Sequence, residues 1–284
     1  MTLMVAPVEM RETTVTVGHR TIKLWIGGKG EPLLMLHGGG PGATGMSNYS
    51  RNIDVLGTSF QLIIPDMPGY GGSTKGISRA DPFGDIAQSM CGMLDKLNVE
   101  RAHVVGNSLG GAVALRLGLE SPERVRRLVL MGPGGIGVGR SIPTKGLMKL
   151  LTYYSGSGPS REKLREFIQY LVFDPSQIGE DLITERYKSS IDPEVIKNPP
   201  LIKPRGLPPR TMDLLRDPRL DRMSHRVLIM WGADDRVNRP SGGLKLLQRL
   251  PNAELYLVNK VGHWIQWERP DEFNDLVSSF LSRR

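Results

Sequence analysis

The 284-residue sequence has a single cysteine, Cys91, and no long run of apolar residues. One cysteine excludes an intrachain disulfide and a cysteine metal cluster, which favours a reducing, cytoplasmic location. The apolar runs fall short of the roughly 18 residues that a membrane span needs. Residues 1–10 lack the basic start and sustained apolar stretch of a secretory signal. We therefore expect a cytoplasmic protein that is not bound to a membrane.

Basic residues are in modest excess, with 37 Lys and Arg against 29 Asp and Glu and a formal net charge of +8. The basic residues are scattered, and aromatic residues make up only 6% of the chain. This pattern argues against a nucleic-acid surface and favours either a solvated surface or a field that steers a small anion. The sequence has no cluster of metal-ligating residues, so we expect neither a metal nor another cofactor.

Short apolar runs alternate with helical patterns, which is typical of a mostly parallel sheet flanked by helices. The runs predict strands at 21–26, 32–36, 60–65, 102–105, 127–131, 226–231 and 254–258, with 13–17 forming an antiparallel hairpin with the first of them. Apolar periodicity predicts helices at 86–97, 108–119 and 271–281. These elements together predict an α/β fold with a mostly parallel central sheet flanked by helices.

The alternation fails between residues 136 and 221, where helical patterns at 145–154, 161–173 and 181–190 precede a proline-rich stretch at 198–209. Because this segment lies between two clear strands, we predict that it is an inserted helical cap. The core domain would then consist of residues 1–135 and 222–284.

Residues 106–110 read G-N-S-L-G, which has the form G-x-S-x-G. They directly follow the predicted strand 102–105 and precede a predicted helix. In this context the serine lies on a tight turn and its hydroxyl projects above the sheet. A purely structural turn serine is the alternative, but the flanking strand and helix favour Ser108 as a nucleophile.

A serine hydroxyl is a weak nucleophile at neutral pH and needs a neighbouring base. His263 follows the last predicted strand, whereas the other histidines lie in a hairpin, at strand boundaries or at the head of a glycine-rich loop. Asp235 follows the preceding strand and would hold the histidine in one tautomer, with Asp234 as the rival acid. The chain order Ser, Asp, His is that of the α/β-hydrolases.

The glycine-rich loop at residues 37–42 reads H-G-G-G-P-G and follows the predicted strand 32–36. Successive glycines let backbone N–H groups face a developing oxyanion. We predict an oxyanion hole formed by the amides of Gly39 and Leu109. A phosphate-binding loop is the alternative, but the stretch lacks the Lys-Ser/Thr ending of a P-loop and the spacing of a dinucleotide fingerprint.

These motifs together resemble the C–C bond hydrolases that cleave meta-ring-fission products of aromatic degradation. The matching segments are H-G-G-G-P-G-A at 37–43, S-N at 47–48, G-N-S-L-G-G at 106–111, M-G-P-G-G at 131–135, D-D-R at 234–236 and G-H-W-I-Q-W-E at 262–268. The triad motifs mark only the superfamily; the triple glycine, the asparagine before the serine and the His-Trp pair are more specific.

The resemblance implies a substrate of the 2-hydroxy-6-oxohexa-2,4-dienoate type. This anion would first be ketonised and then hydrolysed to 2-hydroxypenta-2,4-dienoate and a carboxylic acid. The resemblance also implies a homo-oligomer, a dimer or larger, and a reaction that needs no cofactor.

The resemblance further implies roles for residues that the motifs alone leave unassigned. Arg186, in the predicted cap, matches the arginine that holds the dienoate, and its planar fork suits a carboxylate. Asn107 and Trp264 match residues at the polar end of the substrate. Asn48 matches a residue near the oxyanion loop, and Gly40 completes this set of substrate-binding residues.

Leu171 and Val237 stand where the biphenyl-type branch has aromatic residues in the distal pocket. An aryl ring would lose stacking partners there, so we predict either a smaller or alkyl group at the ketone end or a pocket of a different shape. Two other functions stay open. A carboxylesterase or other acyl hydrolase would use the same triad without needing Arg186, and a ligand-binding protein on a hydrolase scaffold would not need the whole triad.

Overall fold

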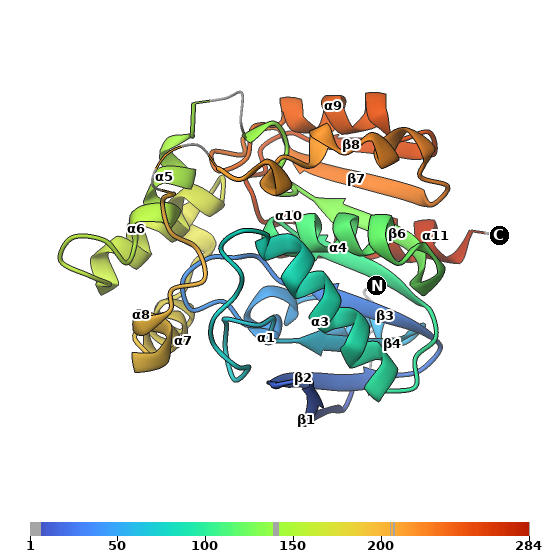
Figure 1. Ribbon diagram of the computed structural model, residues 1–284, viewed down its shortest axis with the longest axis horizontal. Coiled ribbons are helices and arrows are strands. Elements are labelled where there is room, and N and C mark those ends of the chain that lie inside the picture. Colours follow the sequence, from blue (N-terminus) through green and yellow to red (C-terminus); the bar gives the residue numbers. More distant parts are fainter. Residues whose placement is uncertain (1–6, 139–141, 205, 207, 284) are drawn as a thin grey trace.

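The computed structural model describes residues 7–138, 142–204, 206 and 208–283 (Figure 1). Its sheet has eight strands in the order β1-β2-β4-β3-β5-β6-β7-β8. The strands are β1 (Met10–Val17), β2 (Arg20–Gly28), β3 (Glu31–Leu36), β4 (Phe60–Pro65), β5 (Ala102–Asn107), β6 (Val125–Met131), β7 (Arg226–Gly232) and β8 (Ala253–Val258). The pairs β1–β2 and β2–β4 are antiparallel and the remaining pairs are parallel. The mostly parallel sheet and the hairpin predicted from the sequence are confirmed.

Helices cover both faces of the sheet because the side chains of its inner strands alternate between two apolar clusters. In β3, Leu34 and Leu36 point into one cluster, while Leu33 and Met35 point into the other. The first cluster includes side chains of α3 (Pro82–Lys96), α4 (Leu109–Glu120) and α9 (Ser241–Arg249). The second includes side chains of α1 (Gly45–Tyr49), α2 (Ile53–Leu56), α10 (Ile265–Glu268) and α11 (Pro270–Ser282).

Four helices lie together to one side of the sheet and its covering helices (Figure 1). They are α5 (Lys145–Thr152), α6 (Arg161–Leu171), α7 (Glu180–Ser190) and α8 (Pro193–Lys197). Side chains of α5, α6 and α7 form a third apolar cluster with Val237, Trp264 and Trp267, which follow β7 and β8. The helical group therefore packs directly on the loops at the carboxyl ends of these strands.

The helices α5 and α6 begin where periodicity predicts and each ends two residues earlier than expected, while α7 begins one residue before its predicted range. After the proline-rich stretch the chain forms the short 3-10 helices η4 (Arg210–Met212), η5 (Leu214–Arg216) and η6 (Pro218–Arg222). Residues 139–141, 205 and 207 of the predicted cap lie outside the described residues. Within the described part of the chain, no helix is long and apolar enough to cross a membrane.

Candidate active site

Ser108 occupies a sharp turn between β5 and α4. Its backbone has φ 54° and ψ −111°, a strained conformation for a residue other than glycine. The turn is held by the Ser108 N–H, which donates to Met131 O at 2.9 Å, and by Ser108 O, which accepts from Gly134 N–H at 2.8 Å. A Cβ atom at Gly110 would lie 2.2 Å from the Leu36 carbonyl oxygen, so only glycine fits there. The strand, turn and helix expected around the serine are all present.

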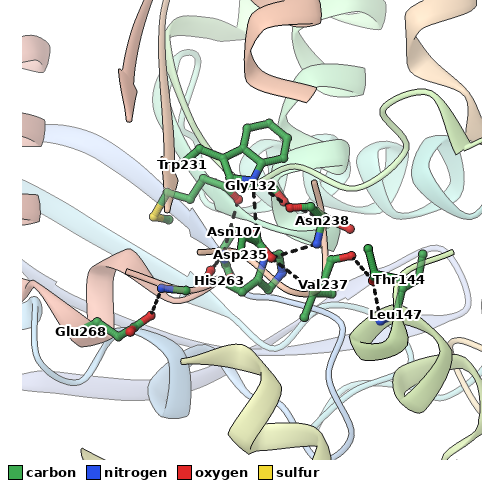
Figure 2. Close-up of polar contacts among 12 residues, drawn as sticks. Asn107, Gly132, Thr144, Leu147, Trp231, Asp235, Val237, Asn238, His263 and Glu268 are labelled. Carbon is green, nitrogen blue, oxygen red and sulfur yellow. Dashed lines mark hydrogen bonds and ion pairs between the residues drawn. The ribbon is translucent and has the colours of Figure 1, made fainter. Parts of the chain in front are cut away.

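His263 and Asp235 form a buried acid–base pair, shown in Figure 2. His263 Nδ1 lies 2.7 Å from Asp235 Oδ2. The other carboxylate oxygen accepts the N–H groups of Val237 and Asn238 at 2.8 and 2.9 Å, and Trp231 Nε1 donates to Oδ2 at 3.0 Å. Because the ionised carboxylate can only accept, Nδ1 carries the proton and Nε2 is left as the basic atom.

The rival acid, Asp234, makes a different contact. Its Oδ2 accepts the N–H of Lys260 at 3.0 Å, which fixes the loop after β8 rather than the histidine ring. The geometry therefore pairs Asp235, and not Asp234, with His263.

Ser108 and His263 line the same cavity, but no hydrogen bond joins their side chains in this structure. His263 Nε2 is buried and has no partner among the described residues. Catalytic hydrogen bonds are often long in unliganded structures and tighten when the substrate binds. Asp235 and His263 are thus hydrogen-bonded to each other, and His263, whose Nε2 is unpartnered, lines the same cavity as Ser108.

The glycine-rich loop after β3 is held by two side chains through its carbonyl oxygens. His37 Nε2 accepts the Met67 N–H at 2.9 Å, so the other ring nitrogen carries the proton and donates to Gly38 O at 2.8 Å. Burial lowers the pKa of His37, which keeps this ring neutral. Tyr70 Oη donates to Gly39 O at 3.1 Å.

The two residues predicted to supply the oxyanion-hole amides, Gly39 and Leu109, lie close together in space. A Cβ atom built on Gly39 would lie 3.1 Å from the Cβ atom of Leu109. Within the described part of the chain, neither the N–H of Gly39 nor that of Leu109 donates a hydrogen bond. Both donors are therefore available to an oxygen atom in the cavity.

Arg186 reaches the cavity from α7 and is almost completely buried, with 1% of the residue exposed. Its Nε donates to Pro41 O at 3.1 Å, and its guanidinium lies 5.0 Å from the centroid of the Trp264 ring. The Nη1 atom has no hydrogen-bond partner, and no carboxylate of the described residues pairs with this side chain. Burial lowers the pKa of Arg186 to about 10, which still leaves a cation at neutral pH. A buried cation without a counter-charge is unfavourable, so the site favours an anionic ligand.

Two asparagines add unpartnered polar atoms to the cavity. Asn107 Nδ2 donates to His263 O at 3.1 Å, while its Oδ1 is buried without a partner. Asn48 Oδ1 accepts the Gly38 N–H at 3.4 Å, while its Nδ2 is unpartnered. Both residues therefore have hydrogen-bonding capacity left for a ligand.

The cavity brings together nearly all residues singled out from the sequence. Its lining consists of Gly38, Gly39, Gly40, Asn48, Asn107, Ser108, Leu150, Phe167, Leu171, Arg186, Val237, His263 and Trp264. Two predicted site residues, Asp235 behind His263 and Leu109 beside Ser108, are not part of this lining. The space between these side chains is only about 10 Å³, roughly the room that one water molecule needs. The described residues include no group of three or more His, Cys, Asp and Glu side chains that could hold a metal.

The family model described as the alpha/beta hydrolase fold matches residues 31–270. This chain belongs to that family. It is 40% identical over 261 residues, 90% of each chain, to a 2-hydroxy-6-oxo-6-phenylhexa-2,4-dienoate hydrolase of Comamonas testosteroni. It is 39% identical over 259 residues to a 2-hydroxy-6-oxononadienedioate/2-hydroxy-6-oxononatrienedioate hydrolase of the same organism, covering 90% of this chain and 89% of the relative.

The fold is also similar to the folds of solved hydrolase structures. A meta-cleavage product hydrolase from Pseudomonas fluorescens IP01 superposes with a TM-score of 0.84 at 30% identity, over 95% of this chain and 97% of that one. A 2-hydroxy-6-oxo-6-phenylhexa-2,4-dienoate hydrolase from Rhodococcus sp. strain RHA1 superposes with a TM-score of 0.85 at 28% identity, over 98% and 100%. The resemblance to meta-cleavage product hydrolases seen in the motifs is thus confirmed.

Several residues of this hydrolase that shape the site were not identified from the sequence. Trp231 donates to the carboxylate of Asp235, and Tyr70 fixes the loop that carries Gly39. Leu150 and Phe167 add apolar surface to the cavity. The only sequence signals were a tryptophan at the end of a buried strand and apolar residues on predicted cap helices, and both are equally typical of core packing.

Proposed function

We propose that the protein hydrolyses the C5–C6 bond of 2-hydroxy-6-oxohexa-2,4-dienoates, giving 2-hydroxypenta-2,4-dienoate and a carboxylic acid. In this proposal Ser108, His263 and Asp235 form the catalytic triad. The observation that carries it is the buried, unpaired guanidinium of Arg186, which faces the same cavity as Ser108 and His263. An ordinary esterase has no need of a buried cation opposite its nucleophile. The similarity to hydrolases of this substrate class supports the same conclusion.

In the proposed complex the substrate lies between the cation and the serine. Its carboxylate accepts hydrogen bonds from Arg186 Nη1, and the conjugated chain runs past the Trp264 ring. The C6 ketone reaches Ser108, with its oxygen facing the N–H groups of Gly39 and Leu109.

The reaction then proceeds in two stages. The 2-hydroxyl proton is lost and C5 gains a proton, which gives a 2-oxo compound whose C5 is a CH₂ group. His263 Nε2, the unpartnered base that faces the cavity, is placed to carry this proton. The change lets the C5 fragment later leave as a stabilised dienolate rather than as a free carbanion.

In the second stage His263 takes the Ser108 Oγ proton as the oxygen attacks C6, and Asp235 stabilises the imidazolium. The tetrahedral oxyanion is held by the two amides. Collapse breaks the C5–C6 bond, and its electron pair moves into the dienolate next to Arg186. The His263 imidazolium then gives its proton to this dienolate, which leaves as 2-hydroxypenta-2,4-dienoate and returns His263 to its neutral form. Water then releases the carboxylic acid from Ser108 with His263 again acting as the base.

We also propose that residues 136–221 act as a cap over a core formed by residues 1–135 and 222–284. The helices α6 and α7 supply Phe167, Leu171 and Arg186 to the cavity. Because the cavity has room for only about one water molecule, a six-carbon substrate requires the cap side chains to move. The cytoplasmic location and the homo-oligomeric state expected from the sequence belong to this proposal as well; gel filtration tests the latter.

The ketone end of the substrate is proposed to carry an uncharged alkyl group. Leu150, Leu171 and Val237 give the cavity an aliphatic wall, and among the described residues Arg186 is the only Lys or Arg side chain in its lining. A second carboxylate would therefore have no partner at that end. Phe167 lies close to the Arg186 guanidinium: an added Cβ on Gly40 would be 2.9 Å from Phe167 Cε1 and 2.5 Å from Arg186 Nη2. Its ring therefore belongs to the carboxylate end of the proposed complex rather than to the ketone end.

An absorbance assay with a panel of dienoates tests this proposal. We expect the highest kcat/KM for methyl- and alkyl-ketone dienoates, and at least tenfold lower values for a phenyl ketone and for a substrate with a distal carboxylate. A strong preference for the phenyl ketone would refute the assignment of the alkyl group. Hydrolysis of p-nitrophenyl esters without any turnover of dienoates would instead identify an acyl hydrolase.

The Tyr70→Phe variant tests the assignment of the oxyanion loop. The change removes the hydroxyl that holds Gly39 O, so we expect kcat to fall about tenfold while KM stays within about twofold. Tyr49→Phe is a matched control, because its buried hydroxyl donates to Leu36 O in β3, outside the loop. Equal losses of kcat in the two variants, measured by steady-state kinetics, would contradict a specific role of the loop.

A further inference from the structure

The end of α6 runs against the loop that carries His263. The His263 N–H donates to Leu171 O at 2.5 Å. The two segments approach so closely at Gly262 that an added Cβ would lie 2.6 Å from Leu171 O and 2.9 Å from Phe173 N. The backbone around the base is therefore in direct contact with the helical group that packs over the site.

One buried carboxylate bridges these two segments. Glu268, at the end of α10, is 6% exposed. Its Oε1 accepts the Gly262 N–H at 2.9 Å and its Oε2 accepts the Phe173 N–H at 2.6 Å. Figure 2 shows this side chain next to His263. No Lys or Arg of the described residues forms an ion pair with it, so backbone donors alone satisfy its oxygens.

The carboxylate also lies in the field of the histidine. Burial raises the pKa of Glu268, whereas the N–H groups of Phe173 and Gly262 and a positive charge on His263 act in the opposite direction. An ionised Glu268 therefore attracts any positive charge that develops on the His263 ring. The other charged groups near the two residues are Asp235 on His263 Nδ1, Arg186 across the cavity and Arg51, which stacks on the neighbouring Trp267 ring.

From these contacts we propose that Glu268 is a positioning residue for His263: its carboxylate fixes the base loop to the end of α6 and adds a second negative charge that favours the imidazolium formed during the reaction. Glu268 touches no reacting atom in this scheme. The inference rests on the proposed Ser-His-Asp function.

Arg236 provides a comparison, because it also binds backbone atoms at the end of α6. Its Nη2 donates to Gln169 O at 2.8 Å and to Val172 O at 2.5 Å. This residue follows Asp235 and is exposed, so solvent screens its charge. Its loss should loosen α6 without changing the charge close to the imidazole.

The test compares Glu268→Gln with Arg236→Gln, using pH–rate profiles for a dienoate. For Glu268→Gln we expect kcat to fall at least tenfold, KM to change less than threefold, and the acidic limb of kcat/KM to move about 0.5–1 unit to lower pH, since the imidazolium loses a nearby negative charge. Arg236→Gln should lower kcat or the melting temperature but leave the limb in place. A Glu268→Gln variant with an unmoved limb overturns the proposal.

Glu268→Asp keeps the test decisive if the glutamine variant does not fold. The shorter side chain retains the charge but does not reach both N–H groups, so we expect a lower kcat with the limb near its wild-type position. An unchanged kcat contradicts the positioning role. If the wild-type protein does not turn over dienoates, the proposed C–C hydrolysis fails by itself, and the same profiles recorded with p-nitrophenyl acetate still test Glu268.

Discussion

Ser108→Ala is expected to lower kcat for C–C hydrolysis by roughly 10³- to 10⁶-fold, the range found when a triad nucleophile is removed. The strained turn places Ser108 in the lining of the same cavity as His263, whose Nε2 has no partner among the described residues. Substrate binding should survive, because Arg186 and Trp264 are unaltered. Stopped-flow absorbance should therefore show formation of the bound dienoate and its ketonisation, followed by a stalled second stage.

A suitable control is Ser73→Ala, since this serine is also buried but donates to Asp66 O away from the cavity. Its kcat should stay within a few-fold of wild type. A loss of only tenfold in Ser108→Ala would contradict covalent catalysis and favour His263 acting as a general base on water. Trapping of an acyl group on Ser108 distinguishes the same two mechanisms from the other direction.

The main elements of the fold could be predicted because their signals are local. Apolar runs marked the strands, and the G-N-S-L-G segment predicted the turn at Ser108, where an added Cβ on Gly106 would meet Gly110 O four residues along the chain at 2.2 Å. The position of β4 between β2 and β3 could not be predicted, because sheet order depends on contacts far apart in sequence. The helices α1, α2 and α10 have only four or five residues, too few for a helical period to be recognised.

In the candidate site, too, residues with a local sequence signal could be predicted, and those that depend on distant contacts could not. Ser108, Asp235 and His263 each follow a strand, so the shared edge of a parallel sheet brings them together. Sequence alone left Asp234 as a rival, and only the hydrogen bonds of the two carboxylates separated them. Glu268 was missed because its role depends on the N–H of Phe173, which lies 95 residues away in the chain.

A second large loss of activity is expected when Arg186 is replaced. Arg186→Met keeps a long side chain that packs on Trp264 but removes the cation, so we expect kcat/KM for the dienoate to fall at least a hundredfold, corresponding to the loss of a buried charge-assisted contact of about 3 kcal/mol. The kcat/KM of Arg186→Lys should lie between those of wild type and Arg186→Met, because an ammonium keeps the charge without the planar fork. Steady-state and single-turnover absorbance measurements separate the effects on binding and on ketonisation.

The same variants offer an internal control through the choice of substrate. p-Nitrophenyl acetate carries no carboxylate, so its hydrolysis by Arg186→Met should stay within about threefold of wild type while dienoate turnover is lost. The unliganded variant should also melt no lower than wild type, because it no longer buries a guanidinium without a counter-charge. Undiminished dienoate turnover by Arg186→Met would contradict the substrate assignment while leaving the triad intact, since His263, Asp235 and Ser108 make none of their contacts through this arginine.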